Sequence, residues 1–347
     1  MTASIGHNGA MALVDGGPVR RPRDGMQLAA RLCALALIVA LVAGCGSSAP
    51  PADSGSGLTS PVSASSAAAT TTADGSGVLR FEGATWSTAY GFGAVWVQVD
   101  PPVDQIVRID AATETVTWAI DRGRGVAFTT DAVWVAVGGE EIQKLDPDSG
   151  EVLLTVPLQT SYLAAGLGSI WAPTPQGLAR VDDQTGDVLA TIPIPEVAEL
   201  TDVAVSDSAV WVTAKDGGKV VQVDPATNTV VASIPTGSGA HDIVVDDNGV
   251  WVTNYRANSV SRIDPVTGQV VATIDGVGSG VGIDTGGDAV WVSNKSFGIY
   301  RIDPATNQAT LVIERPGWSY GLAYTEGGLW VSGTDTREVA HLALPDD

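Results

Sequence analysis

A short apolar segment centred on tryptophan recurs seven times along this 347-residue chain, at almost constant spacing. The repeated residues are Trp96, Trp134, Trp171, Trp211, Trp251, Trp291 and Trp330. The steps between them are 38, 37, 40, 40, 40 and 39 residues. A period near 40 residues is typical of one four-stranded propeller blade, so the repeat predicts an all-β fold with seven blades. We expect these tryptophans to pack between blades as core residues.

Each repeat carries the pattern of a four-stranded antiparallel sheet, and residues 242–275 show it most clearly. The expected strands are 243–245, a strand around Trp251, 260–263 and 270–274. The last two are joined by Asp264, Pro265, Val266, Thr267 and Gly268. In such a turn Asp accepts hydrogen bonds from the backbone, Pro fixes φ and Gly supplies the left-handed residue. The sequence therefore predicts a hairpin here, and similar turns begin at Asp146, Asp224 and Asp303.

The seventh repeat lacks its fourth strand. After Trp330 and an expected strand at 338–342, the sequence ends at Asp347. Residues 78–81 have no first three strands of their own, but they align with the fourth strand of the fifth repeat. We expect this N-terminal segment to complete the last blade and close the ring, which leaves few free sheet edges. The predicted domain, residues 78–347, is a seven-bladed β-propeller of four-stranded antiparallel blades.

The region before the predicted propeller resembles an export signal. Residues 32–44 form an apolar run that follows several arginines and is short for a transmembrane helix. The run ends in Leu41, Val42, Ala43, Gly44 and Cys45, which resembles the lipobox of bacterial lipoproteins. The resemblance implies that residues 1–44 are removed, that Cys45 is lipidated, and that the lipid anchors the chain to the outer face of the bacterial cytoplasmic membrane. Met1 and Met26 both stay open as the start of translation.

The amino-acid composition limits the kinds of partner and ligand that we expect for the predicted domain. Residues 45–77 consist almost wholly of Ser, Ala, Thr, Pro, Gly and Asp, which is typical of a disordered tether. Both cysteines, Cys33 and Cys45, precede the propeller, so the domain is expected to have no disulfide and no thiolate metal ligand. The formal net charge of −21 disfavours binding to nucleic acid. It favours either simple solubility or the binding of cationic ligands. We expect a monomer that contacts the membrane through its lipid anchor.

Candidate binding residues gather at one end of the expected channel. In a propeller, the loops that lead into each first strand meet there, together with the loops between second and third strands. Aligned at the first kind of loop, the repeats give a ring of Trp86, Arg124, Ser161, Thr201, His241, Ser279 and Tyr320. From both kinds of loop, the predicted ligand-binding residues are Trp86, Arg124, Tyr255, Arg256, Asn294, Lys295, Trp318 and Tyr320. These positions vary between repeats while the strands do not, which is where a site can be built.

Three of these aromatic residues lie outside the tryptophan repeat. Trp86 and Trp318 fall in the expected loops of the first and seventh blades, which become neighbours when the ring closes. With Tyr320 they form an expected platform for a sugar, an aromatic group of a peptide or a cationic group. The alternative is that these rings cap the propeller core.

His241 is the candidate catalytic residue. It follows a glycine-rich segment and is expected near Asp242, Tyr255 and Arg256. A general base needs a pKa near neutrality beside a positioned substrate, which histidine can provide. The alternative is a loop residue that only makes hydrogen bonds. His341 is expected on a third strand away from the channel, and no metal, phosphate or catalytic-serine motif is present, so we predict no metal site.

The repeat unit resembles two known groups of propellers. The segment from the Trp251 strand to residue 274 is similar to the YVTN-type repeats of surface and periplasmic proteins and to the repeats of the streptogramin B lyases. The resemblance covers residues 78–344 and implies a seven-bladed propeller. It also implies, for a lyase, a magnesium-assisted site of several His and Glu residues in the last blades. His241 is the one counterpart in this sequence, and a second channel histidine is missing.

Two hypotheses of function follow from these observations. The first is a lipid-anchored, extracytoplasmic recognition or scaffold module that binds a small molecule, a glycan or a peptide and needs no cofactor. The second is a streptogramin B lyase-like enzyme, a C–O lyase that uses His241 and magnesium. Because the fold alone does not decide function and the second histidine is missing, the sequence favours the module without catalytic activity.

Overall fold

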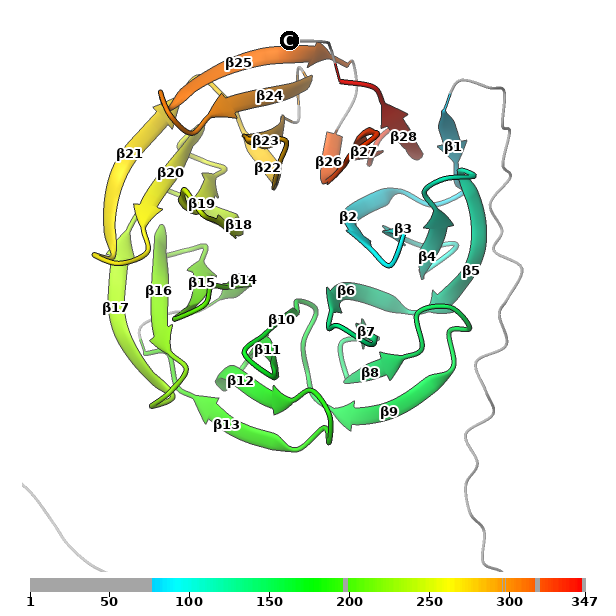
Figure 1. Cartoon of the computed structure of the whole chain (residues 1–347), viewed down its shortest axis with the longest axis horizontal. Helices are drawn as coiled ribbons and strands as arrows, with labels where there is room; N and C mark the ends of the chain where they lie inside the picture. Colours follow the sequence, from blue (N-terminus) through cyan, green and yellow to red (C-terminus); the bar gives the residue numbers. More distant parts are fainter. Residues whose placement is uncertain (1–76, 196–198, 295, 297, 316–318, 345–347) are drawn as a thin grey trace, which may run out of the picture. The chain divides into compact units, whose positions relative to one another are not determined.

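The computed structural model describes residues 77–195, 199–294, 296, 298–315 and 319–344. Within these residues the chain forms seven four-stranded antiparallel sheets, arranged as blades around a common centre (Figure 1). The first strand of each blade is innermost and the fourth strand is outermost (Figure 1). The prediction of an all-β, seven-bladed propeller is therefore confirmed.

Six blades are formed by consecutive strands of the chain. Blade 1 contains β2 (Thr85–Gly91), β3 (Ala94–Val99), β4 (Gln105–Asp110) and β5 (Thr115–Asp121), and blade 2 contains β6 (Gly123–Phe128), β7 (Val133–Val137), β8 (Glu141–Leu145) and β9 (Val152–Pro157). Blade 3 contains β10 (Ala164–Gly166), β11 (Ser169–Thr174), β12 (Gly177–Asp182) and β13 (Val188–Ile192), and blade 4 contains β14 (Leu200–Val205), β15 (Val210–Ala214), β16 (Lys219–Asp224) and β17 (Thr229–Pro235). Blade 5 contains β18 (Ala240–Asp246), β19 (Gly249–Asn254), β20 (Ser259–Asp264) and β21 (Gln269–Asp275), and blade 6 contains β22 (Gly280–Gly286), β23 (Ala289–Asn294), β24 (Gly298–Asp303) and β25 (Gln308–Glu314).

Blade 7 is completed by the N-terminal strand. It contains β26 (Ser319–Thr325), β27 (Gly328–Gly333) and β28 (Glu338–Leu342), and β1 (Val78–Arg80) pairs with β28 as its outer strand. The pairing buries Leu79 and Phe81, which are 3% and 5% exposed. The backbone N–H of Phe81 also donates to the carbonyl of Arg337 over 2.9 Å. The predicted closure of the ring by an N-terminal strand is thus confirmed.

The repeated tryptophans fill the spaces between blades. Each lies on the second strand of its blade and is at most 3% exposed. Trp96, for example, belongs to one cluster with Val133 and Val135 of the next blade. A buried tryptophan removes on the order of 200 Å² from water, which at about 25 cal/mol per Å² corresponds to about 5 kcal/mol. The predicted packing role of these residues is confirmed, and they are not available for a ligand.

The aspartate turns between third and fourth strands are formed as expected. The Oδ1 atom of Asp264 accepts hydrogen bonds from the backbone amides two and three residues later, at 2.9 and 2.8 Å. These hydrogen bonds from the backbone lower the pKa of Asp264, because they stabilise its carboxylate. Gly268 takes the left-handed conformation with φ of 65°, and Asn228 and Asn307 take it in blades 4 and 6. Within the described residues no helix has the length and apolar character needed to cross a membrane.

Weakening the closing strand should destabilise the domain. Leu79→Ala is expected to lower the free energy of unfolding by about 2 to 4 kcal/mol, because it leaves a cavity where blades 1 and 7 share a core. Val266→Ala is the matched control, since Val266 is 91% exposed and surface truncations cost about 0.5 kcal/mol or less. Urea unfolding measures the free energy of unfolding of both variants, and equal values would contradict closure by β1.

Deletion of residues 77–82 should likewise destabilise the domain more than deletion of residues 46–76. Equal stabilities of the two deletion variants would also contradict closure by β1.

Candidate functional site

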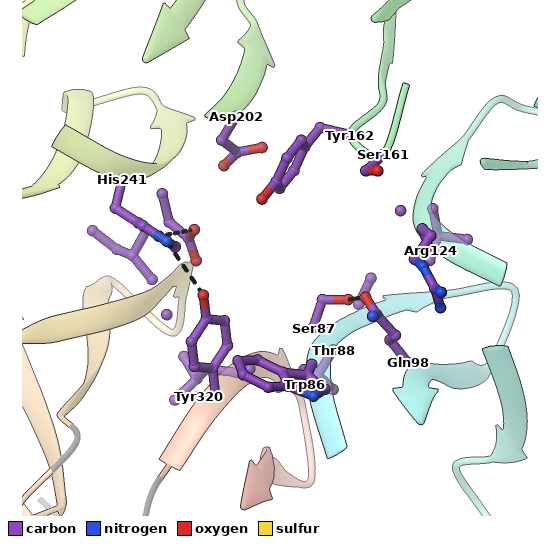
Figure 2. Close-up of a pocket in the computed structure, with 18 of the residues that line it drawn as sticks. Trp86, Ser87, Thr88, Gln98, Arg124, Ser161, Tyr162, Asp202, His241 and Tyr320 are labelled. Carbon is purple, nitrogen blue, oxygen red and sulfur yellow. Dashed lines mark hydrogen bonds and ion pairs between the residues drawn. The ribbon is translucent and has the colours of Figure 1, made fainter. Parts of the chain in front are cut away.

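A cavity of about 450 Å³ opens where the inner strands of all seven blades meet (Figure 2). Its polar and aromatic lining residues include Trp86, Ser87, Thr88, Gln98, Arg124, Ser161, Tyr162, Asp202, His241, Asp242 and Tyr320. Blade 6 contributes Gly282 and Ile283. A volume of this size suits a small ligand, for which cavities of about 300 to 1,000 Å³ are usual.

In five blades a β-bulge in the first strand turns side chains into the cavity, whereas Ser161 and Tyr162 of blade 3 come from the segment before β10. In β18 the register shifts between Ala240 and Ile243, so that His241 and Asp242 oppose the single residue Thr253 of β19. Equivalent shifts occur at Trp86 and Ser87, at Arg124 and Gly125, at Thr201 and Asp202, and at Tyr320 and Gly321. An extra residue in one strand breaks the regular alternation and re-aims its side chains. In blades 1, 2, 5 and 7 both residues of the bulged pair line the cavity, and in blade 4 Asp202 alone does.

The structure differs from the sequence prediction at these bulges. The expected first strand at 243–245 begins at Ala240, and Trp86, Arg124, His241 and Tyr320 all lie within strands, whereas loops were expected. The mistake arises because a bulge interrupts the apolar alternation that marks a strand. Five members of the expected ring line the cavity, namely Trp86, Arg124, Ser161, His241 and Tyr320.

Two members of the expected ring do not line this cavity. Thr201 is buried, with its hydroxyl 3.0 Å from that of Thr213, and the neighbouring Asp202 lines the cavity in its place. In blade 6 the lining residue is Gly282 and not Ser279, whose hydroxyl donates to Asn258. The sequence analysis thus missed Asp202.

Three further predicted ligand-binding residues lie outside this cavity. Tyr255, Arg256 and Asn294 are not among the residues that line the cavity. The backbone of Tyr255 binds the carbonyl of Gly239, Arg256 is half-exposed and Asn294 is buried. The Nδ2 atom of Asn294 donates to the carbonyl of Val277 over 2.6 Å, so this side chain has a structural partner. Lys295, Trp318 and Cys45 lie outside the described residues.

His241 is held between two neighbours (Figure 2). Its Nδ1 atom is 2.7 Å from Oδ1 of Asp242, and its Nε2 atom is 3.2 Å from the hydroxyl of Tyr320. The ring of Tyr320 in turn contacts Trp86 edge to face, with centroids 4.7 Å apart. Burial alone lowers the pKa of His241, but the charge and hydrogen bond of Asp242 outweigh it, so the pKa is raised. The rings of His241, Tyr320 and Trp86 thus form a continuous aromatic wall, joined by a hydrogen bond and by edge-to-face contacts.

Asp202 and Tyr162 form the opposite, acidic part of the wall (Figure 2). The carboxylate of Asp202 accepts backbone hydrogen bonds from Val203 and Ile243, at 2.8 and 3.0 Å. Burial and the negative charge of Asp242 raise the pKa of Asp202 to about 8. Burial, followed by the charges of Asp242 and Asp202, raises the pKa of Tyr162 to about 12. Negative charge is therefore unfavourable on this side of the cavity near neutral pH, unless a cation compensates it.

Three hydroxyl groups hold the backbone of the residues that form this aromatic wall, His241, Tyr320 and Trp86. Each lies two positions after the repeated tryptophan of the preceding blade. Thr213 donates to the carbonyl of His241 over 2.7 Å, Ser293 donates to that of Tyr320 over 2.9 Å, and Ser332 donates to that of Trp86. The sequence analysis missed these positioning residues, although Ser or Thr two residues after the tryptophan was a readable signal.

Arg124 is the basic residue of the cavity wall. Its Nη1 atom is 2.6 Å from Oδ1 of Asp104 and 3.3 Å from the carbonyl of Gly123. Ser161 and Gln98 lie near it on the same side of the cavity (Figure 2). A guanidinium this close to a carboxylate has most of its charge compensated, so it is a weak attractor for an anionic ligand.

The described residues of the cavity do not offer the several His and Glu ligands of the magnesium site implied by the lyase resemblance. Among the described residues no group of three or more His, Cys, Asp or Glu side chains is arranged to hold a metal ion. His241 also has both ring nitrogens engaged by Asp242 and Tyr320. Since hard cations such as Mg²⁺ require several converging oxygen ligands, this donor set does not fit one.

Comparison with known proteins places the fold in context. No protein-family model and no curated protein sequence matches the chain. Among solved structures, a streptogramin B lyase superposes with a TM-score of 0.65 and 16% identity, covering 77% of this chain and 96% of that one. The virginiamycin B lyase of Staphylococcus aureus gives a TM-score of 0.66 and 15% identity, covering 77% and 98%. A computationally designed protein gives 0.59 and 17%, covering 74% and 82%. The chain therefore shares the propeller fold of the streptogramin B lyases.

Proposed function

We propose that this propeller is a recognition module that binds a small molecule, or one residue of a glycan or peptide, in its central cavity. The observation that carries the proposal is a single cavity lined by all seven blades, whose lining residues differ from blade to blade. The strands behind these residues repeat closely. A uniform scaffold that presents different side chains toward one cavity is the usual arrangement of a binding site.

The aromatic wall is the expected contact surface for the ligand. Trp86 and Tyr320 pack edge to face and both border the cavity. Aromatic rings give a large contact area with little loss of side-chain freedom on binding. The hydroxyls that hold the backbone of these residues keep the wall in place before a ligand arrives, which reduces the entropy lost on binding.

The state of His241 favours binding over catalysis. A general base must reach the proton that it removes, directly or through one water. His241 is only 8% exposed, and its Nε2 atom, the ring nitrogen that does not face Asp242, is already 3.2 Å from the hydroxyl of Tyr320. We therefore assign it to the support of Tyr320. A lyase-like reaction would require these contacts to break.

We further propose that the module works outside the cytoplasmic membrane, attached by a lipid at Cys45. The support for this part is the apolar segment that ends in the lipobox-like residues before Cys45, followed by the Ser-, Ala- and Thr-rich segment up to the propeller. A lipid-anchored receptor of this kind would present its cavity to solutes outside the cell.

Truncation of the aromatic wall should weaken ligand binding. In a thermal-shift screen against sugars, amino acids, short peptides and streptogramins, a ligand at about 100 times its Kd stabilises the protein by roughly 2.7 kcal/mol. For each hit, Trp86→Ala and Tyr320→Ala should each weaken binding by about 1 to 3 kcal/mol. Tyr90→Ala is the matched control, because Tyr90 is an exposed residue of the same strand as Trp86 and does not line the cavity.

His241→Ala separates a binding protein from an enzyme. In a binding protein this variant should weaken binding less than Tyr320→Ala does, because His241 acts through Tyr320, and wild type should leave a streptogramin B intact in the presence of magnesium. In an enzyme that uses His241 as a base, the same variant should lower turnover by about 100-fold or more. Turnover of a streptogramin by wild type that disappears in His241→Ala would overturn the proposed function.

Cys45→Ser should release the protein from the membrane fraction. The 13-residue apolar run at 32–44 is too short to replace a lipid as a stable membrane span. Cell fractionation followed by blotting measures the distribution, and Cys33→Ser is the matched control. Retention of Cys45→Ser in the membrane fraction at the wild-type level would refute lipid anchoring at this residue.

A further inference from the structure

The acidic part of the cavity wall is built from two carboxylates on neighbouring blades. Asp202 of blade 4 and Asp242 of blade 5 both line the cavity. Asp202 binds the backbone N–H of Ile243, the residue next to Asp242, over 3.0 Å. The bulges in β14 and β18 thus bring the two side chains to the same part of the cavity. Two partly buried like charges repel each other unless a cation or a proton compensates them. Asp242 has the ring of His241 beside it, whereas among the described residues Asp202 accepts hydrogen bonds from backbone amides alone.

Aromatic rings complete the surroundings of this pair. Tyr162 lies beside Asp202, and Tyr320 and Trp86 form the adjoining wall (Figure 2). The face of an aromatic ring carries partial negative charge and attracts cations, most strongly in a desolvated site. Carboxylates and ring faces around one cavity therefore select for positive charge attached to an apolar group.

The basic groups near the cavity do not oppose this selection, because each has an acidic partner. Arg124 is bound to Asp104 at 2.6 Å. Lys215, which lies close enough to His241 to lower its pKa, is 3.8 Å from Glu199. His241 itself is paired with Asp242 at 2.7 Å. Asp202 has no cationic side chain among its hydrogen-bond partners in the described residues, which are both backbone amides.

We propose that the cavity recognises a ligand with a cationic amine on an apolar or aromatic body, the amine lying between Asp202 and Asp242 and the body lying against Trp86 and Tyr320. This inference rests on the proposed recognition function and specifies its ligand class. The net charge of −21 on the whole chain would add a long-range attraction for such cations.

Three probes of nearly equal size test the charge preference. Phenethylamine, phenethyl alcohol and 3-phenylpropionate carry a positive, a neutral and a negative head group on the same ring. Titration calorimetry near pH 8 is expected to give an affinity for the amine about tenfold or more above that for the alcohol, with the carboxylate weakest. This comparison uses only the wild-type protein, so it does not depend on the folding of any variant.

The variant Asp202→Asn tests whether the preference for the amine depends on the two carboxylates, Asp202 and Asp242. The variant keeps a similar side-chain shape and one oxygen acceptor for the backbone, but it cannot carry charge. It should weaken amine binding about tenfold or more while leaving the alcohol within about twofold of wild type. The matched control is Asp207→Asn, because Asp207 is an exposed residue of the same blade and should leave all three affinities unchanged.

The pH dependence gives an independent readout. Benzyltrimethylammonium keeps its charge at every pH, so any change in its affinity reflects the protein. Because the pKa of Asp202 is raised to about 8, this carboxyl is mainly neutral at lower pH and becomes anionic as the pH rises. Affinity should therefore rise about fivefold or more from about pH 6.5 to about pH 8.5. The other titratable groups around Asp202 are Asp242, His241, Tyr162 and Tyr320. The part of the rise due to Asp202 should be missing in Asp202→Asn.

The outcomes distinguish failure of the amine inference from failure of the proposed function. Binding of the alcohol or the carboxylate as tightly as the amine would overturn the amine inference and leave the recognition function standing. Equal amine affinity in wild type and Asp202→Asn would also overturn the amine inference. If no probe bound the wild-type domain and the wider screen gave no ligand, both the inference and the proposed function would fail.

Discussion

The candidate site depends on closure of the ring by pairing between the two ends of the domain. Trp86 and Tyr320 belong to blades 1 and 7, so the contact between their rings crosses the point of closure. The hydrogen bond from Ser332 to the carbonyl of Trp86 crosses it as well, and so does the 2.8 Å bond from the hydroxyl of Thr85 to the carbonyl of Glu338. β1 supports this junction by placing Leu79 in the core that blades 1 and 7 share. The strand pairing therefore both stabilises the fold and assembles the aromatic wall.

Within the closed ring, framework and site use different parts of each blade. The second strands carry the tryptophans and the positioning hydroxyls, and they are almost wholly buried. The first strands carry the bulges, which present variable residues to the cavity. The side chains at the bulges therefore differ between blades, while the buried second strands keep the same tryptophan packing. Because the residues that face the cavity are separate from the residues that pack the blades, a shared propeller fold does not by itself indicate a shared activity.

The fold was predictable because its signals are local or periodic. The tryptophan spacing gave the number of blades, the aspartate turns gave the hairpins, and the unmatched segment at 78–81 gave the closure. The site was only partly predictable, because bulges hide strand ends and hydrogen bonds between blades have no local signature. Trp86, Arg124, His241 and Tyr320 were placed at the correct end of the blades but in loops. Asp202 was missed because its neighbour Thr201 aligned with the ring, although Thr201 is buried and bound to Thr213.

The central claim is that the bulged first strands form one cavity that recognises a cationic amine. A crystal structure of the propeller domain with phenethylamine bound tests this claim most directly. The account predicts the ammonium group about 3 Å from the carboxylate of Asp202, within normal hydrogen-bond distance, and the phenyl ring against Trp86 and Tyr320. An amine found beside Arg124, or outside the cavity altogether, would contradict it.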